Sequence, residues 1–287
     1  MITIFTPTYN RAYILPQLYN SLIKQNNNNF EWIIVDDGST DSTKEIVDKW
    51  IKEKKIVIRY FYQENQGKPI AHNCGVKNAK GELFVCVDSD DYLTENAVKT
   101  ILDKWRKIKY SKDCTGIVGM RITENGMPVG TLIPKIQYST LDDLYTKYKY
   151  KGDTILIFRT EIIKKYLFPK IEGEKFIPET YLYDKIDQEG KLATIQEGIY
   201  ICKYLEDGYT ANTINIIKNN PKGYALCAKQ KIQVTQSYRN KFKFCAKYVL
   251  GNILANEKGY IHKSPEKILT ILSIPFAYSI YYKKYYK

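Results

Sequence analysis

Three carboxylates lie within four residues, directly after an apolar run. Residues 83–87 are apolar, and Asp88, Asp90 and Asp91 follow them. Like charges this close repel one another, and a bound cation is the usual way to keep them ionised. Hard oxygen ligands suit Mg²⁺ or Mn²⁺, which share their coordination shells with substrate phosphates. The segment therefore indicates a metal–phosphate site; the alternative is a helix N-terminus whose acidic residues favour the helix dipole.

Two further polar segments carry residue types that bind nucleotides. Asp37 closes the apolar run 32–35 together with Asp36, and a carboxylate there would accept from a base N–H or a ribose hydroxyl. The alternative is an Asp-Gly turn with a helix cap. Residues 65–69 place Lys68 at the start of a helix that contains His72, where backbone N–H groups and an ammonium would meet a diphosphate. The segment lacks the two glycines and the final Gly-Lys-Ser/Thr of an ATPase phosphate loop, and a single histidine is also typical of a structural role.

Alternating strands and helices must position these segments. The sequence predicts three helices: one over 13–25, one that begins after a cap at Asp41 or Ser42, and one over 70–79. It predicts strands over 2–6, 32–35, 56–62 and 83–87. Such alternation predicts a mostly parallel sheet with helices on both faces, and ligands bind beyond the carboxyl ends of its strands. Further strands are predicted over 116–122, 154–159 and 194–201, and the chain from about residue 215 is predicted to be helical.

Composition excludes several classes of protein. The 287 residues are 44% hydrophobic and 26% charged, which is typical of a soluble globular protein. A formal charge of +13 favours an anionic partner. Two histidines and six scattered cysteines without a CxxC pair argue against a zinc site, and no run reaches the ~18 apolar residues of a membrane span. Since no basic segment precedes the first apolar run, we expect a cytoplasmic protein.

Six segments in order resemble the family 2 glycosyltransferases, which are inverting enzymes with the GT-A fold. They are residues 6–11 (TPTYNR), 34–41 (IVDDGSTD), 65–68 (NQGK), 71–75 (AHNCG), 79–82 (AKGE) and 88–91 (DSDD). A looser resemblance, to a bacterial branch that builds surface polysaccharides such as capsules, continues through residues 173–179, 206–208 and 220–224. The chain departs from the family at His72, where Arg is frequent, and it has no evident late histidine to serve as a metal ligand.

The resemblance assigns residues to a UDP-sugar donor and its metal. Pro7, Tyr9 and Asp37 would hold the base, with Asp37 accepting from uracil. Asp90 would ligate Mn²⁺ or Mg²⁺ across the donor diphosphate, and Asp88 would bind ribose or the metal. Lys68 and His72 are the candidate diphosphate contacts.

Inversion also requires a base that takes the proton of the acceptor hydroxyl. Glu179 aligns loosely with the catalytic carboxylate of the family and is the principal candidate, although a Glu after Pro178 is also typical of a surface helix end. Asp184 and Asp153 are weaker candidates.

The expected organisation has three parts. Residues 1–113 would form the donor-binding half of the GT-A domain, 114–214 its acceptor-binding half, and 215–287 a basic, aromatic helical extension. Lys and Tyr favour the headgroup layer of a membrane, so residues 268–282 are predicted to lie on an anionic membrane surface, which we expect to be the inner face of the plasma membrane. The alternative is a helical subdomain that packs its apolar face on the main domain.

The predicted reaction moves a sugar from a nucleotide donor to a hydroxyl of a saccharide or a polyprenyl-diphosphate-linked acceptor. One alternative is a sugar nucleotidyltransferase, although residues 6–10 stand where its Gly-rich, Arg-containing loop would be expected. The other is a basic nucleic-acid-binding protein, for which the sequence shows no recognisable motif.

Overall fold

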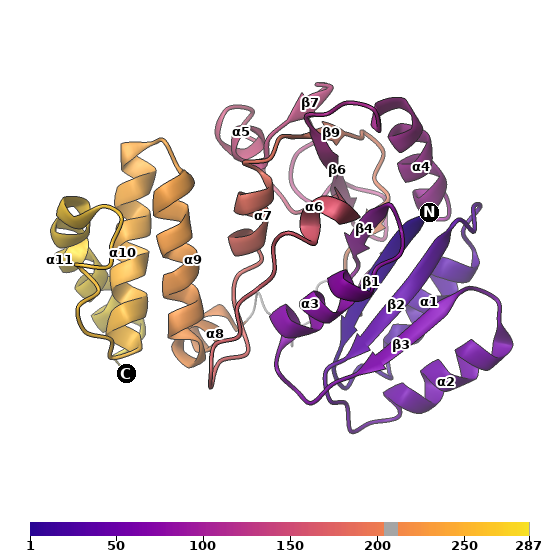
Figure 1. Cartoon of the computed structure of the whole chain (residues 1–287), viewed down its shortest axis with the longest axis horizontal. Helices are drawn as coiled ribbons and strands as arrows, with labels where there is room; N and C mark the ends of the chain where they lie inside the picture. The colour runs from indigo at the N-terminus through magenta and orange to yellow at the C-terminus, as the bar shows by residue number, and fades with distance from the viewer. Residues whose placement is uncertain (204–211, 287) are drawn as a thin grey trace. The chain divides into compact units, whose positions relative to one another are not determined.

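The computed structural model describes residues 1–203 and 212–286 (Figure 1). Two compact units divide the chain: Met1–Leu167 with Lys185–Leu205, and Phe168–Asp184 with Glu206–Lys287. Residues 206–208, which belong to the looser family resemblance, lie outside the described residues. The three functional parts expected from the sequence stay a prediction, because compact units record packing and not donor or acceptor binding.

The first unit begins with four parallel strands in the order β3-β2-β1-β4. Their bounds are β1 Ile2–Thr8, β2 Phe30–Asp36, β3 Ile58–Tyr62 and β4 Leu83–Cys86. The connecting helices are α1 Leu15–Ile23, α2 Thr43–Glu53 and α3 Lys68–Asn78. Right-handed crossovers place α1 and α2 on one face of the sheet and α3 on the other, as Figure 1 shows. The predicted α/β sheet covered on both faces is confirmed, and every residue of β2 is buried.

The second part of the sheet mixes strand directions. Strand β8 Thr154–Arg159 is antiparallel to both β4 and β6 Cys114–Ile122. Parallel to β6 run β9 Lys191–Thr194 and β10 Tyr200–Ile201. The edges carry β5 Tyr92–Leu93 on β10 and β7 Tyr138–Ser139 on β9. Helices α4 Ala97–Ile108, α5 Leu141–Thr146 and α6 Thr160–Ile163 complete this unit.

Two expectations about local structure are wrong. The strand predicted over 194–201 is two strands, because β9 pairs with the start of β6 and β10 with its last two residues, leaving 195–199 to connect them. Residues 88–91 do not begin a helix. They form a turn before β5, and α4 starts only at Ala97.

A buried carboxylate stabilises the amino-terminal end of the parallel strands. Glu31 accepts hydrogen bonds from the Thr3 hydroxyl (2.7 Å), the Lys80 backbone N–H (2.7 Å) and the Arg59 guanidinium (3.1 Å). Burial opposes ionisation of Glu31, but these donors outweigh it and hold its pKa below 4.5. The side chain therefore ties β1, β2 and β3 to the segment before β4.

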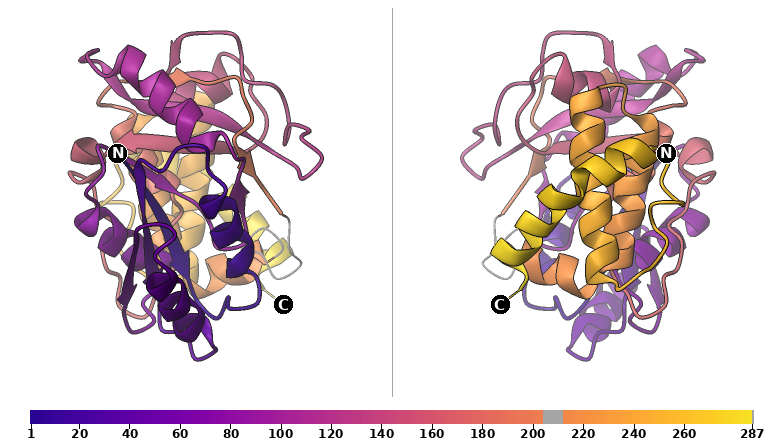
Figure 2. Two further views of the ribbon diagram at one scale, coloured as in Figure 1. Left: turned by 90° about the vertical axis from the view of Figure 1, so that its right-hand side faces the viewer. Right: turned by 90° about the vertical axis from the view of Figure 1, so that its left-hand side faces the viewer.

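The second unit is helical among its described residues. It contains most of α7 Thr180–Ile186, together with α8 Thr213–Asn219, α9 Pro221–Val234, α10 Tyr238–Leu254 and α11 Lys267–Lys284. Helix α10 packs against both α9 and α11, and Figure 2 shows α11 crossing α10 obliquely. The predicted helical extension is thus confirmed. Within residues 1–203 and 212–286, no helix has the length and hydrophobicity needed to cross a membrane.

Candidate functional site

The loops that follow β1, β2 and β4 meet at one edge of the sheet. These strands are parallel and adjacent, with Thr8 opposite Asp36, so their carboxyl ends lie together. Asn10 links the first two loops: its N–H donates to the Ser39 hydroxyl (2.8 Å), and its side-chain oxygen accepts from the Thr40 N–H (2.8 Å). The first two loops therefore hold each other in place beside the ends of the strands.

Asp37 connects the end of β2 to the loop that precedes α3. Its carboxylate accepts from the Gln63 side chain (2.7 Å) and from the backbone N–H groups of Gln66 (2.9 Å) and Gly67 (2.7 Å). Gly67 has a φ of 90°, in the left-handed region that favours glycine. These bonds fix the turn that starts α3 and therefore the position of Lys68.

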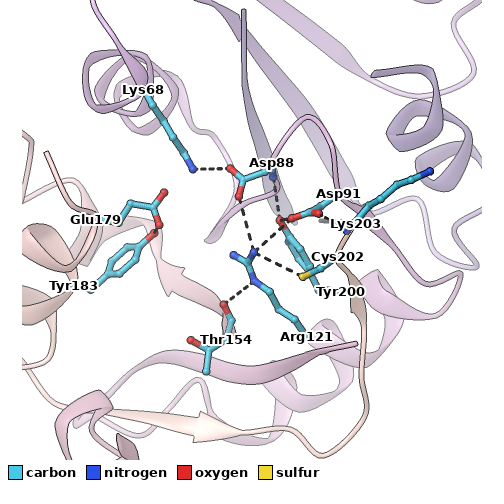
Figure 3. A network of polar contacts seen from close by, with 10 residues as sticks. All are labelled: Lys68, Asp88, Asp91, Arg121, Thr154, Glu179, Tyr183, Tyr200, Cys202 and Lys203. Carbon is cyan, nitrogen blue, oxygen red and sulfur yellow. Dashed lines mark hydrogen bonds and ion pairs between the residues drawn. The ribbon is translucent and has the colours of Figure 1, made fainter. Parts of the chain in front are cut away.

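Lys68 in turn reaches the predicted metal-binding segment. Its ammonium donates to the Asp88 carboxylate over 2.6 Å, and the Arg121 guanidinium lies 4.0 Å from the other oxygen of Asp88 (Figure 3). Burial opposes ionisation of Asp88, but the charges of Lys68 and Arg121 outweigh it and lower its pKa. Asp37, Lys68 and Asp88, three residues singled out in the sequence, are thus brought together through one loop.

Asp91 and Tyr200 form an anchor that the sequence did not indicate. The Tyr200 hydroxyl donates to Asp91 (2.7 Å) and accepts from the Asp88 N–H (3.1 Å). The Lys203 N–H also donates to Asp91 (3.0 Å). Burial and the charge of Asp88 raise the pKa of Asp91 to about 6, although these two donors and the charge of Arg121 lower it. The anchor attaches the turn at residues 88–91 to β10 (Figure 3).

Arg121 is the second residue of this site that sequence reasoning missed. Its guanidinium lies 3.4 Å from Asp91 and 4.2 Å from the centre of the Tyr200 ring, and its Nε donates to the Thr154 carbonyl (3.1 Å). Nearby negative charge raises its pKa against the effect of burial, so it stays cationic. One signal was present in the sequence: Arg121 is a charged residue within the otherwise apolar strand β6.

Asp90 fits the role of a cation ligand. It is half-buried, and burial together with the charge of Asp88 raises its pKa. A divalent cation would favour the ionised form of Asp90 and so offset the free-energy cost of its burial beside Asp88. Among the described residues no three His, Cys, Asp or Glu side chains group into a metal cluster. The residues present therefore fit a cation that is held by one or two carboxylates and takes its other ligands from substrate phosphates and water.

The remaining predicted donor contacts differ in exposure. Tyr9 is about half exposed (49%), and Pro7 is half-buried within β1. His72 is only 2% exposed, and its ring packs edge-on against Phe5 and Phe84 with 5.5 Å between ring centres. This places His72 in the core beside β1 and β4, and its contact with a diphosphate stays a prediction.

Glu179, the principal base candidate, and Asp184, a weaker one, belong to the second unit. The Tyr183 hydroxyl donates to the Glu179 carboxylate (3.3 Å), at the start of α7. Asp184 instead accepts from the Lys231 ammonium over 2.6 Å, in an ion pair that joins α7 to α9. Asp153, the other weaker candidate, precedes β8 in the first unit.

Comparison with known proteins identifies the family. The family model described as "Glycosyl transferase family 2" matches residues 3–167, more than half of the chain, and the chain therefore belongs to this family. The glycosyltransferase GlyG of Streptococcus pneumoniae is 28% identical over 219 residues, which cover 70% of each chain. The poly(ribitol-phosphate) beta-N-acetylglucosaminyltransferase TarS of Staphylococcus aureus is 35% identical over 99 residues, which cover 34% of this chain and 17% of TarS.

Solved structures show the same fold. Residues 1–349 of S. aureus TarS in complex with UDP-GlcNAc match 95% of this chain and 79% of that one, with a TM-score of 0.66 and 22% identity. The mannosyltransferase PcManGT of Pyrobaculum calidifontis, in complex with GDP-Man and Mn²⁺, matches 98% of this chain and 81% of that one, with a TM-score of 0.58 and 16% identity. The predicted GT-A fold is therefore confirmed, and the chain is a glycosyltransferase.

Proposed function

We propose that this glycosyltransferase takes its sugar from a UDP donor, requires Mn²⁺ or Mg²⁺, and inverts the anomeric centre. The contacts of Asp37, Lys68 and Asp88 at one sheet edge support this proposal most directly. Asp37 supplies an acceptor for a base N–H, Lys68 supplies an ammonium, and Asp88 supplies a second carboxylate. All three lie at the edge where nucleotides bind in such sheets. The UDP-GlcNAc complex of TarS supports the choice of nucleotide.

The donor roles follow from this placement. Pro7, Tyr9 and Asp37 hold the uracil, and Lys68 contacts the diphosphate. Asp90 ligates the cation, assisted by Asp88, and the cation when bound supplies a Lewis acid for the departing diphosphate. Arg121 and the N-terminal end of α3 add positive potential where negative charge develops on the leaving group.

Glu179 is the proposed base for the acceptor hydroxyl. The Tyr183 hydroxyl orients its carboxylate, as a base requires. Asp184 is less suited, because its carboxylate is engaged in the ion pair with the Lys231 ammonium that joins α7 to α9. We therefore assign Asp184 a structural role.

The acceptor is proposed to be a hydroxyl of a saccharide or a lipid-linked saccharide in a bacterial surface polysaccharide. The resemblance of the sequence to that branch supports this, as does the likeness to TarS, whose name specifies poly(ribitol phosphate). Family membership favours glycosyl transfer over the alternatives of nucleotidyl transfer and nucleic-acid binding.

Calorimetry of UDP binding, with and without Mn²⁺, tests the donor proposal. Wild-type protein should bind UDP more tightly with Mn²⁺, and Asp90→Asn should lose that gain while its circular dichroism stays unchanged. Asp113→Asn, a matched change of an exposed aspartate, should bind like wild type. If wild type and Asp90→Asn bind UDP equally well with Mn²⁺, Asp90 is excluded as a ligand of the metal. Binding of GDP or dTDP in place of UDP would refute the choice of nucleotide.

A further inference from the structure

Helix α11 exposes five large apolar side chains on one side. Ile268, Ile271, Leu272, Phe276 and Tyr282 are each more than half exposed, and we call these five residues the α11 outer face. At 100° per residue they occupy one side of the helix. The Phe276 ring also packs edge-on against Phe242 of α10, with 5.1 Å between ring centres. The α11 outer face therefore continues toward α10.

The fully buried residues on the opposite side of α11 are small or polar, and partly buried apolar residues flank them. Thr270, Ser273 and Ala277 are all fully buried, and the Thr270 hydroxyl is hydrogen-bonded to that of Ser264 at 2.7 Å. The Ser273 hydroxyl donates to the Thr270 carbonyl (2.8 Å). A helix that served only to cover this unit would bury its large apolar residues fully, whereas Leu269, Ile274 and Ile280 are only partly buried against the core. The apolar side chains on the α11 outer face would therefore gain free energy if another surface removed them from water.

Positive charge lies at both ends of this face. Lys267 begins α11, and Lys283 and Lys284 end it; all three are exposed. Residues 212–286 contain thirteen Lys and Arg against two Glu. A second copy of this unit docked on the same face would bring like charges together. Anionic headgroups would neutralise them while the apolar side chains leave water.

We propose that the α11 outer face binds the surface of an anionic lipid bilayer, with α11 lying in the plane of the interface. Ile268, Leu272 and Phe276 would enter the boundary between headgroups and acyl chains, and the lysines would contact headgroup phosphates. Tyr282 suits the headgroup level, because its ring is apolar and its hydroxyl is polar. This inference goes beyond the transferase activity and does not depend on the donor assignment.

Vesicle sedimentation with the full chain tests the proposal. Wild-type protein should sediment with vesicles of mixed phosphatidylcholine and phosphatidylglycerol, and much less with phosphatidylcholine alone or at high salt. Leu272→Ser and Phe276→Ser should each weaken the partition coefficient about tenfold, since each removes one large apolar side chain from the interface. A double change, Lys283→Glu with Lys284→Glu, should reduce binding to the anionic vesicles at least about tenfold.

Matched variants control for general surface effects. Leu132→Ser changes an exposed leucine of the first unit, and Lys52→Glu with Lys99→Glu makes the same change of net charge there. Both should bind vesicles like wild type. UDP binding without lipid, measured on every variant, reports whether the fold and the donor site persist. Vesicle binding without UDP binding in the wild type would refute only the donor proposal.

Three results would overturn the inference. The first is that wild-type protein does not bind anionic vesicles. The second is that Leu272→Ser and Phe276→Ser bind as well as wild type does. The third is a dimer of the wild-type protein in sedimentation equilibrium that becomes a monomer in Phe276→Ser, together with no binding to vesicles. That result would mean that a second copy of the chain covers the α11 outer face.

Discussion

The hydroxyl of Tyr200 donates to the carboxylate of Asp91 across 109 positions of sequence. The same hydroxyl accepts from the Asp88 N–H, so one oxygen atom joins both ends of the carboxylate turn. The short strand β10, which carries Tyr200, thereby determines the backbone position of the residues proposed to meet the metal. The conformation of the turn depends on a residue that follows it by more than a third of the chain.

Tyr200→Phe should destabilise the fold and weaken metal-dependent UDP binding. The change removes the acceptor for one backbone N–H and the donor to a buried carboxylate, and unsatisfied buried groups cost about 1–3 kcal/mol. Urea unfolding would measure the stability, and calorimetry with Mn²⁺ the binding. Tyr110→Phe, at an exposed tyrosine, is the matched control. Unaltered stability of Tyr200→Phe would mean that the hydroxyl does not support the turn.

Arg121→Met should cost about 3 kcal/mol of unfolding free energy, because it removes the cation beside the buried carboxylate of Asp91 and leaves Asp88 with Lys68 alone. Arg121→Lys should recover only part of this loss, since an ammonium cannot reproduce the planar contact with the Tyr200 ring and the bond to Thr154. Chemical denaturation would compare both with Arg106→Met, which alters an exposed pair with Asp103. Full recovery by Lys would show that charge alone matters.

Glu179→Gln should lower kcat by about 10²–10⁴-fold while UDP affinity stays unchanged, because a general base acts on the acceptor and not on the donor. Glu172→Gln, an exposed glutamate of the same segment, should retain wild-type turnover. Asp184→Asn should mainly reduce stability, since it breaks the ion pair with Lys231. Wild-type kcat in Glu179→Gln would exclude Glu179 as the base.

Glu31→Gln should destabilise the protein at pH 7 by about 1–3 kcal/mol, because the buried site is built for a charged acceptor. The pKa of Glu31 is lowered below 4.5 on folding, so its stabilisation is present at neutral pH. It is lost as the pH falls from about 4.5 through the folded-state pKa. Urea unfolding at a series of pH values should show the gap between wild type and variant closing in acid. The exposed Glu64→Gln should leave the profile unchanged.

The four parallel strands and their helices were predictable because their signals are local. Apolar runs such as 32–35 are long enough to specify buried strands, and polar segments follow them at positions where parallel strands end. The loop at residues 65–68 and the aspartates at 37 and 88 were found for the same reason. Their contacts with one another follow from neighbouring strands of one sheet.

The rest depends on pairing over long distances in the sequence. Nothing near Tyr200 indicates that it serves the turn at residues 88–91, and β10 has only two residues. The single strand predicted over 194–201 failed because its two ends pair with different parts of β6, which the sequence near them does not indicate. The role of Arg121 required knowledge that β6 and β10 are neighbours, which hydrophobic periodicity does not supply.

The position of β8 has a consequence for how the chain is made. Strand β4 has β1 on one side and β8 on the other, yet β8 lies about seventy residues further along the chain. A nascent chain that has emerged only as far as residue 113 would therefore present β4 as an open, apolar edge, ready to pair with another chain. A fragment of residues 1–113 is thus expected to aggregate when expressed alone. A fragment that extends through residue 167 would close this edge.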